Sequence, residues 1–554
     1  MTDGLAIALA QINPTVGDIG GNIGVIRAAR ERAANLGADL VVTGELAVAG
    51  YPLEDLVLKR SFQNGIEAAV RAFAAETADG GPAVLLGAPW RVDGELFNAA
   101  LLLDGGEIRA VTLKHELPNY GVFDEKRVFT AGTLPKPIEF RGARLGVMIC
   151  EDMWVPGVAG KLAGDGADIL VVLNGSPFEF DKPGVRGELA RERVGETGLG
   201  LIYVNLVGGQ DELVFDGNSF VIDAVGGFTH QLKPWAEDVR RTEWHAGSDG
   251  WVCESSELSP ALSELEAIYL ALVVGLRDYV GKNRFPGVVL GLSGGIDSAL
   301  SAAIAVDALG RDRVLLIAMP SPYTSRESVE DAEKIATLLG SRLESISIEP
   351  AMEAYQSMLG ELFTGRDTDA TEENIQARAR AVTLMAVSNK FGHMLLTTGN
   401  KSEMSVGYAT IYGDMCGGYS VLKDVYKTTV FALSRWRNGV CPEGVLGPDG
   451  EVMPERVITK PPSAELKPDQ TDQDTLPPYE DLDAILGALV EGERSVAEVV
   501  AAGYDEATVR RIWRMLDMAE YKRRQAPPGV KISHRAFGRD RRYPITNRFT
   551  NTIG

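Results

Sequence analysis

The sequence predicts an α/β fold in two parts, and three observations support this prediction. The chain has 554 residues, more than a single hydrophobic core usually accommodates. Short apolar segments alternate with segments of helical periodicity along most of the chain. Strand-like segments dominate the first half, whereas strands and helices follow one another regularly in the second. We therefore expect stacked sheets flanked by helices first, and a doubly wound parallel sheet second.

The first half is rich in predicted strands. Residues 22–36 have the spacing of an amphipathic helix between two apolar segments, and an Asp-Gly-Gly turn at 104–106 joins two strands as a hairpin. The predicted strands cover residues 5–10, 39–43, 83–90, 97–103, 108–113, 145–149, 169–173, 201–205 and 219–223. So many strands with few helices are typical of two sheets packed face to face.

A segment without periodicity, residues 244–260, separates the halves and is rich in Ser, Gly and Glu, so we expect the domain boundary there. Beyond it, strands are predicted at 288–292, 314–319, 342–348 and 393–398, with helices at 262–280, 297–308 and 325–339. This alternation favours a parallel, doubly wound sheet. The Pro- and Asp-rich segment 447–478 is long for a passive connection, which favours a lid or a substrate loop.

Composition excludes several classes of protein. A net charge of −22 argues against a general nucleic-acid binder. The apolar runs are too short to span a membrane, and the first residues lack the basic region of a signal peptide. Four cysteines without CxxC spacing argue against a disulfide framework, so we expect a cytoplasmic protein. The basic tail at 522–548 either docks on a neighbouring acidic surface or holds an anionic substrate.

The stretch VVLGLSGGIDSAL at 288–300 places a glycine-rich turn between a strand and a helix. Backbone N–H groups and a helix N-terminus in such a turn can bind a phosphate. Ser293 and Ser298 add hydroxyl donors, and Asp297 adds an oxygen ligand suited to Mg²⁺. The lysine of the Walker pattern is absent. An ordinary tight turn would explain the two glycines alone, but the complete loop suits a leaving pyrophosphate with Mg²⁺.

This SGGIDS loop resembles the pyrophosphate loop of the ATP-pyrophosphatase enzymes, which split ATP between its α- and β-phosphates. Further along the chain stand ENIQAR at 373–378, TTGNKSE at 397–403 and YGD at 412–414. These three strings resemble motifs of NAD synthetase and occur in the same order. The second follows a predicted strand, at the edge where doubly wound sheets bind their ligands.

The resemblance implies a ligand for each matching residue. ATP and its pyrophosphate would be held by Gly291, Leu292, Ser293, Gly294, Gly295, Ile296, Asp297, Ser298, Met319, Thr398 and Lys427. Deamido-NAD would be held by Asn374, Arg378, Lys401, Glu403, Asp414 and Lys522. Asp297 and Glu403 would also ligate Mg²⁺. Any one of these side chains could be an ordinary surface charge, but three ordered motifs argue against that for the set.

Three residues of the first half form a second candidate site. Glu45, Lys114 and Cys150 each follow a strand-like segment, and the last two stand in the strings KHELPNYGVFDE and CEDMW. In this order they resemble the Glu-Lys-Cys triad of the nitrilase and amidase family. A thiolate can attack an amide carbonyl, a carboxylate can accept the thiol proton, and an ammonium can stabilise the oxyanion. Tyr120, Ser176 and Lys182 match positions that bind glutamine in related amidotransferases.

Together these features resemble the glutamine-dependent NAD⁺ synthetases over nearly the whole chain. The resemblance implies a nitrilase-like α-β-β-α sandwich with glutaminase activity in residues 1–255. It implies an ATP-pyrophosphatase domain with the adenine-nucleotide α-hydrolase-like fold in residues 260–554. Glutamine would supply ammonia for the ATP-dependent amidation of deamido-NAD, with Mg²⁺. The family also implies a homo-oligomer with the synthetase site at a subunit interface, and no nucleic-acid or membrane partner.

Three other functions stay open from the sequence. Another glutamine amidotransferase of the ATP-pyrophosphatase type, resembling GMP or asparagine synthetases, would share the loop but carry a different glutaminase fold. A stand-alone amidase with a degenerate nucleotide domain as regulator would not need both Asp297 and Glu403. A non-catalytic sensor of NAD precursors would bind nucleotide without turnover and would need neither the triad nor the intact loop.

Overall fold

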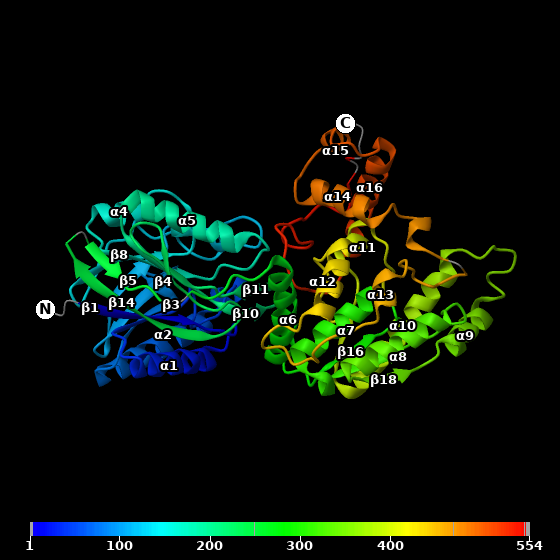
Figure 1. The fold of residues 1–554 in the computed structure, drawn as a ribbon, viewed down its shortest axis with the longest axis horizontal. Helices are drawn as coiled ribbons and strands as arrows, with labels where there is room; N and C mark the ends of the chain where they lie inside the picture. Colours follow the sequence, from blue (N-terminus) through cyan, green and yellow to red (C-terminus); the bar gives the residue numbers. More distant parts are fainter. Residues whose placement is uncertain (1–3, 249, 257, 469, 548, 550–554) are drawn as a thin grey trace. The chain divides into compact units, whose positions relative to one another are not determined.

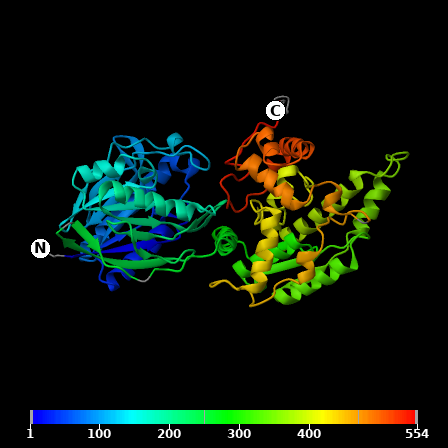
Figure 2. The ribbon, with the colours of Figure 1, turned by 45° about the horizontal axis from the view of Figure 1, so that its top comes forward.

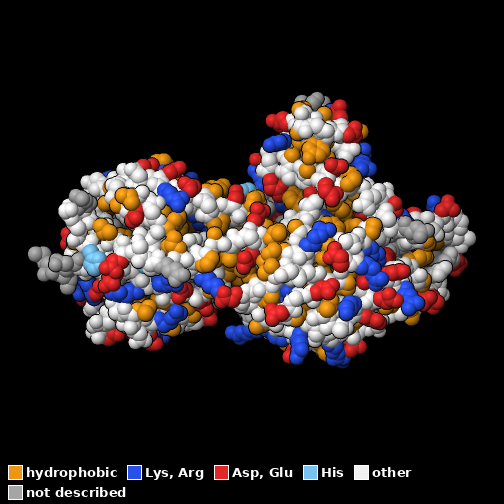
Figure 3. Space-filling view, viewed as in Figure 1, with side chains coloured by type: hydrophobic (Ala, Val, Ile, Leu, Met, Phe, Trp, Pro, Cys, Tyr) orange, Lys and Arg blue, Asp and Glu red, His pale blue; other side chains and the backbone are white. Residues whose placement is uncertain are grey.

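The structure is a computed structural model, and it describes residues 4–248, 250–256, 258–468, 470–547 and 549. The chain divides into two compact units, Met1–Leu262 and Ser263–Gly554 (Figure 1). Among the described residues, no helix has the length and apolar character needed to cross a membrane. Acidic and basic side chains are interspersed over the face drawn in Figure 3.

The first unit contains two mixed sheets. Their strand orders are β15-β14-β1-β2-β3-β4-β5 and β13-β12-β9-β8-β7-β6. The first sheet consists of β1 (Gly4–Gln11), β2 (Leu40–Val42), β3 (Ala83–Val92), β4 (Glu95–Asp104), β5 (Glu107–Leu113), β14 (Asp238–Gly247) and β15 (Gly250–Cys253). The second consists of β6 (Ile138–Phe140), β7 (Ala143–Ile149), β8 (Ile169–Asn174), β9 (Gly200–Asn205), β12 (Phe220–Ile222) and β13 (Phe228–Gln231). A separate hairpin joins β10 (Val207–Gln210) and β11 (Leu213–Asp216).

The helices of the first unit cover the outer faces of its two sheets (Figures 1 and 2). Apolar side chains of the inner faces, such as Ile7, Val147 and Val171, form one buried cluster between the sheets. The outer face of the first sheet packs on α1 (Ile19–Asn35) and α2 (Arg60–Glu76). That of the second packs on α4 (Val158–Gly164) and α5 (Lys182–Thr197), while α3 (Glu151–Trp154) follows β7 directly. The predicted α-β-β-α arrangement is confirmed.

The second unit is built on a five-stranded, all-parallel sheet with the order β18-β17-β16-β19-β20. Its strands are β16 (Val288–Gly291), β17 (Val314–Ala318), β18 (Arg342–Ser345), β19 (Met394–Thr397) and β20 (Tyr419–Ser420). Its helices include α6 (Glu264–Lys282), α7 (Ile296–Leu309), α8 (Arg326–Leu339), α9 (Glu349–Leu359), α10 (Ala370–Phe391) and α12 (Lys427–Gly439). The predicted parallel α/β fold is confirmed here as well.

Further helices complete the second unit. They are α11 (Lys401–Val406), α13 (Glu455–Thr459), α14 (Tyr479–Val490), α15 (Val496–Ala501), α16 (Glu506–Met518) and α17 (Glu520–Arg523). Helices α14 to α16 form an apolar cluster of their own, which also includes Val406 of α11 and Phe537 of the C-terminal segment. One-turn 3₁₀ segments lie at Glu54–Leu58, Thr77–Asp79, Glu125–Arg127, Arg311–Arg313 and Asp472–Asp474.

Two local predictions differ from the structure. The segment expected to lack regular structure from residue 244 begins inside β14, which pairs with β1 as far as His245 and continues to Gly247, and it also contains β15. The strand expected at 342–348 ends at Ser345, and α9 begins at Glu349 with Pro350 in its first turn, a favourable position for proline. Local composition indicated neither the pairing of β14 with its neighbours nor the start of α9, and these two features set the observed boundaries.

Candidate active sites

Glu45, Lys114 and Cys150 come together in the first unit, where strands β2, β5 and β7 end. The Lys114 Nζ donates to Glu45 Oε1 at 2.7 Å. At most 4% of any of the three residues is exposed. Burial raises the pKa of the Cys150 thiol well above its usual value, and the nearby charge of Glu45 adds to this while Lys114 opposes it. The thiol is therefore protonated at rest and needs a base to become a nucleophile.

The backbone at Cys150 is also unusual. Its φ is +45°, in the left-handed region that non-glycine residues rarely adopt. Its N–H donates to the Leu173 carbonyl at 2.9 Å, and helix α3 starts at the next residue. A sharp turn between a strand and a helix that holds a reactive side chain in a strained conformation is typical of functional sites.

Glu45 is fixed by groups on both of its oxygens. Asn98 Nδ2 donates to Oε1 at 2.7 Å, and the Gly175 N–H donates to Oε2 at 2.9 Å. Together with Lys114, these donors hold the carboxylate in one orientation. A base that is already oriented loses little freedom when it accepts a proton.

A second carboxylate, Glu125, completes this group, and the sequence analysis missed it. Lys114 Nζ lies 2.9 Å from both oxygens of Glu125, and the Tyr51 hydroxyl donates to Oε1 at 3.0 Å. Burial raises the pKa of Glu125 to about 7. The charge of Lys114 opposes this shift, and the charge of Glu45 adds to it. Its position at the end of the string LPNYGVFDE was the available signal. For Lys114, burial lowers the pKa, but the charges of Glu125 and Glu45 hold it well above its usual value.

The residues predicted to bind glutamine lie on segments around Cys150. Tyr120 is exposed, and its hydroxyl donates to Glu151, the residue after Cys150, at 3.0 Å. The ammonium of Lys182 lies 5.6 Å from the centre of the Phe123 ring, which meets the Tyr120 ring edge-on at 5.4 Å. The Tyr120 hydroxyl and the Lys182 ammonium, whose side chains both contact the Phe123 ring, are groups that can bind the carboxylate of an amino acid.

Ser176 is buried and is held from two sides. Its N–H donates to Asn205 Oδ1 at 2.9 Å, and Arg186 Nε donates to its hydroxyl oxygen at 3.1 Å. Arg186 itself is balanced by Asp216, at 2.7 Å. With its oxygen already accepting a hydrogen bond, the Ser176 hydroxyl is oriented to donate.

In the second unit, a cavity of about 330 Å³ lies at the carboxyl ends of the parallel strands. Its lining includes every residue predicted to hold ATP: the loop from Gly291 to Ser298, Met319, Thr398 and Lys427. It also includes Glu403 and Asp414. Arg380, Lys460 and Glu465 line the same cavity, and no sequence motif had indicated them.

The loop that opens α7 is closely packed and internally hydrogen-bonded. Gly294 has a φ of +81°, and a Cβ there would lie 2.2 Å from the Ser328 carbonyl oxygen, so only glycine fits. Ser293 N–H donates to Ser298 Oγ at 3.2 Å, and Gly295 N–H donates to Ser293 Oγ at 3.1 Å. The α7 N-terminus is directed at the turn, which makes it a suitable phosphate site.

Asp297 and Glu403 face one ammonium group. Lys427 donates to Asp297 Oδ2, and its Nζ lies 3.6 Å from Glu403 Oε1. Asn400 Nδ2 donates to the other oxygen of Asp297 at 2.9 Å. Burial raises the pKa of Glu403 to about 8, and repulsion by Asp297 adds to it. Two carboxylates with one ammonium leave excess negative charge in a buried place, a donor set that fits a divalent cation.

Four of the residues predicted to hold deamido-NAD meet on the segment from 407 to 414. Asn374 Oδ1 accepts from Thr410 Oγ1 at 3.0 Å, and Arg378 Nε donates to the Ile411 carbonyl at 3.3 Å. Asp414 Oδ1 accepts from the Thr410 N–H at 2.6 Å. Lys522 donates to two carbonyl oxygens of this segment. These side chains thus share one loop beside the cavity. Lys401, by contrast, is completely buried and does not line the cavity.

The segment 447–478, expected to be a lid or a substrate loop, contributes one wall of the cavity. Glu465 accepts hydrogen bonds from Ser325 Oγ and Ser328 Oγ at 2.8 Å, at the start of α8. Lys460 donates to Glu465 at 2.9 Å. Val452 and Met453 are fully buried. The segment is therefore anchored to α8 in this conformation.

The basic tail is held on the second unit by acidic groups and carbonyls. Arg523 donates to the Ser405 carbonyl at 2.7 Å and pairs with Glu520 at 2.8 Å. Arg541 is buried within 3.5 Å of Glu520 and stacks on the Tyr543 ring. A docked arm accounts for these charges.

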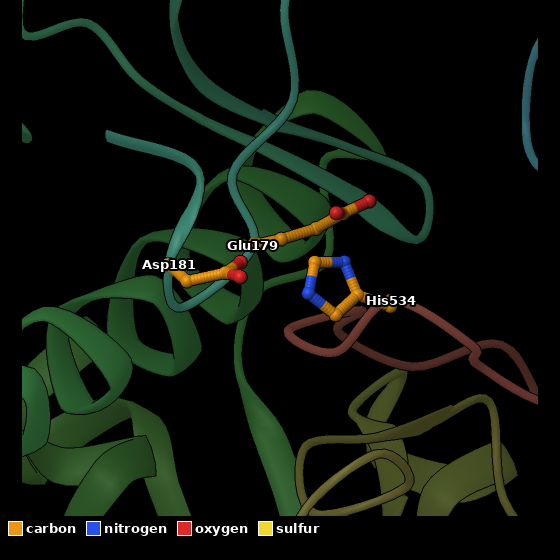
Figure 4. Close-up of side chains that lie close together, drawn as sticks. All are labelled: Glu179, Asp181 and His534. Carbon is orange, nitrogen blue, oxygen red and sulfur yellow. The ribbon is translucent and has the colours of Figure 1, made fainter. Parts of the chain in front are cut away.

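Figure 4 shows Glu179 and Asp181, which precede α5 in the first unit, and His534 of the second unit. The two units are not placed relative to one another, so these side chains are not counted as a metal site.

Comparison with known proteins agrees with both sites. The family model for carbon-nitrogen hydrolases matches residues 6–244, and the model for NAD synthases matches residues 268–526. A glutamine-dependent NAD(+) synthetase of Rhodobacter capsulatus is 49% identical over 549 residues, which cover 99% of each chain. That of Acinetobacter baylyi is 44% identical over 542 residues, 98% of each chain. The chain belongs to the glutamine-dependent NAD(+) synthetase family. The family predicted from the motifs, and the prediction of a ligase, are confirmed.

Solved structures of this family extend the agreement to the fold. The glutamine-dependent NAD+ synthetase of Acinetobacter baumannii, solved in complex with ADP, has a TM-score of 0.79 at 42% identity and covers 98% of this chain and 99% of its own. The enzyme of Cytophaga hutchinsonii has a TM-score of 0.83 at 23% identity, which shows the shared fold.

Proposed function

We propose that this chain converts deamido-NAD to NAD with ATP and with ammonia released from glutamine, giving AMP, pyrophosphate and glutamate as the other products. One observation supports this most strongly: the same chain carries a buried Glu-Lys-Cys group in one unit and a complete pyrophosphate loop beside two carboxylates in the other. An amidase alone would not need the second site. A nucleotide sensor would need no nucleophile.

In the first site, Cys150 would attack the carboxamide carbon of glutamine. Glu45, held by Lys114, Asn98 and the Gly175 N–H, would accept the thiol proton as the carbon–sulfur bond forms. The Lys114 ammonium would stabilise the oxyanion. The leaving amine would take the proton back and depart as ammonia, leaving a γ-glutamyl thioester. Glu45 would then activate the water that hydrolyses this thioester and releases glutamate.

In the second site, the nicotinate carboxylate of deamido-NAD would attack the α-phosphate of ATP. The leaving pyrophosphate would be received by the N–H groups and hydroxyls of the loop at 293–298. A Mg²⁺ ion held by Asp297 and Glu403 would neutralise charge on the phosphates. Lys427 would add a positive charge from α12. Ammonia would then attack the mixed anhydride, form the amide and release AMP.

We also propose the remaining parts of the assignment. Residues 1–255 would form the glutaminase domain and residues 260–554 the synthetase domain. Tyr120, Ser176 and Lys182 would bind glutamine, because they offer a hydroxyl that contacts Glu151, an oriented serine and an ammonium beside Phe123 in the same unit as Cys150. Asn374, Arg378, Asp414 and Lys522 would bind deamido-NAD through the loop they share. The enzyme would act as a homo-oligomer with this site near a subunit interface, as in the family.

The test compares the wild type with Cys150→Ala, each given deamido-NAD, ATP and Mg²⁺, with either glutamine or ammonium chloride. We expect the variant to lose NAD formation from glutamine and to keep it from ammonium chloride. NAD, AMP and pyrophosphate are measured together. A wild type that forms no NAD from either nitrogen source would contradict the assignment of the second site.

A further inference from the structure

Lys401 lies in surroundings different from those of the residues that line the cavity. It is the first residue of α11, it is 0% exposed, and it does not line the cavity. Its Nζ lies 2.5 Å from Glu491 Oε1, 2.6 Å from Asp424 Oδ1 and 2.7 Å from Ser533 Oγ. These three residues and Lys401 are called the Lys401 cluster below. An ammonium has three N–H donors, so this one is saturated by the protein itself.

The Lys401 cluster joins segments that are far apart in the sequence. Asp424 precedes α12, Glu491 ends α14, and Ser533 belongs to the C-terminal segment. Asp424 also accepts from the N–H groups of Ile532 and Ser533 at 2.8 and 2.7 Å. Burial lowers the pKa of Lys401, but the charges of Asp424 and Glu491 outweigh it and hold the pKa above its usual value. The ammonium is therefore charged, and it holds these segments to the start of α11.

The same turn of α11 carries the groups that face the cavity. Asn400 caps the helix by accepting from the Glu403 N–H at 2.9 Å, and its amide donates to Asp297 at 2.9 Å. Lys401 and Glu403 are two positions apart, which on a helix directs their side chains to nearly opposite sides. A helix of six residues is not stable by itself, so its orientation depends on such tertiary anchors.

We propose that Lys401 is a positioning residue of the synthetase site: the Lys401 cluster fixes the first turn of α11 and so holds Glu403 near Asp297. The C-terminal segment is then part of the support of the site, and Lys401 itself does not contact deamido-NAD. The inference rests on the proposed function, because it assigns Glu403 and Asp297 to the divalent cation of that reaction.

The experiment uses the full chain as wild type, Lys401→Met and Ser533→Ala. The matched control is Arg437→Met, because Arg437 is an equally buried cation that pairs with Asp307 at 2.7 Å elsewhere in the same unit. Two quantities are measured: NAD formation from ammonium chloride as Mg²⁺ is varied, and binding of Mn²⁺ in the presence of ATP, followed by the paramagnetic resonance of free Mn²⁺. Thermal unfolding of each variant is recorded alongside.

We expect Lys401→Met to raise the half-saturating Mg²⁺ concentration and to lower the Mn²⁺ affinity, each by about tenfold or more. Loss of groups that orient metal ligands has effects of this size. Ser533→Ala removes one hydrogen bond to the ammonium and one to Asp424, and it should change both quantities in the same direction by about two- to fivefold. Arg437→Met should unfold at a lower temperature but keep the wild-type metal dependence.

Two results would overturn the proposal. One is a folded Lys401→Met with wild-type Mg²⁺ dependence and Mn²⁺ affinity. If Lys401→Met does not fold, the other is a Ser533→Ala variant that unfolds at a lower temperature but has the wild-type Mg²⁺ dependence and Mn²⁺ affinity. A wild type that makes no NAD would contradict the proposed function instead, and the Mn²⁺ measurement would still decide the role of Lys401.

Discussion

Gly294→Ala tests the pyrophosphate loop by a change of one methyl group. Gly294 has a φ of +81°, and an added Cβ would lie 2.2 Å from the Ser328 carbonyl oxygen and 2.9 Å from its carbonyl carbon. Side-chain carbons do not approach backbone oxygens closer than about 3 Å, so the loop and the start of α8 must separate by roughly 1 Å. The left-handed backbone adds about 1–2 kcal/mol of strain for an alanine.

The expected effect follows from the position of the loop. Its N–H groups would bind pyrophosphate only in the present geometry, and losing one well-placed donor to a developing charge costs about 10²–10³ in rate. We therefore expect kcat/KM for ATP in NAD formation from ammonium chloride to fall by about a hundredfold or more. Glutamine hydrolysis, which depends on the other unit, should stay near wild type.

Gly392→Ala is the control for backbone strain alone. Gly392 ends α10 with a φ of +72°, and the nearest atom to its Cβ would be Pro286 Cγ at 3.9 Å. This variant should lose the same strain energy of about 1–2 kcal/mol and keep its ATP kinetics. If both variants have the same kcat/KM for ATP within about twofold, the loop does not need its present geometry and the argument is refuted.

Three further predictions concern charged groups. Asp297→Asn should reduce NAD formation from ammonium chloride by about a hundredfold or more, because it removes one of two carboxylates for the cation, while steady-state glutamine hydrolysis continues. Glu125 has a folded-state pKa of about 7, raised above its value in the unfolded chain, so its contribution to stability is complete at acidic pH and is lost as pH rises through about 7. Chemical denaturation of wild type and Glu125→Gln between pH 5 and pH 8 should therefore show a smaller loss of stability in the variant, and parallel curves would contradict this. Asn98→Leu should slow formation of the γ-glutamyl thioester by about tenfold or more, since Glu45 loses a donor at 2.7 Å; an unchanged burst of ammonia would show that Glu45 needs no such support.

Much of the fold could be predicted because periodicity was strong where packing is regular. The buried strands β16, β17 and β19 are continuous apolar runs, which parallel sheets covered on both faces require. The last part of the second unit could not be predicted in the same way. Helices α14 to α16 bury their apolar residues against one another and against Phe537, and this partner lies near the end of the chain. Local sequence does not contain that information.

The same distinction between local sequence and distant partners applies to the site residues. The loop at 293–298 would bind through its own backbone and hydroxyls, and its hydrogen bonds are local, so its sequence was sufficient to predict a phosphate site. Lys401 stands in an equally distinctive motif, yet the motif does not say which way the side chain points. Its acceptors, Asp424, Glu491 and Ser533, come from three distant segments, and only their folding decides that the ammonium is buried. Glu125 was missed for the same reason, because its role depends on Lys114 being near.

The two sites have the same imbalance of charged groups but differ in geometry. Each has a buried lysine between two carboxylates, and so an excess of one negative charge. In the first unit Lys114 lies within 2.9 Å of both Glu45 and Glu125. One carboxyl pKa is raised in each site, to about 7 for Glu125 and to about 8 for Glu403. In the second unit Lys427 contacts Asp297 closely but lies 3.6 Å from Glu403. The second pair is therefore more open. A compact group in which one lysine contacts both carboxylates suits the acid–base steps of amide cleavage, whereas a more open carboxylate pair beside a glycine-rich loop suits a divalent cation. The loop itself contains no lysine, and Lys427 of α12 donates to its aspartate from outside the loop.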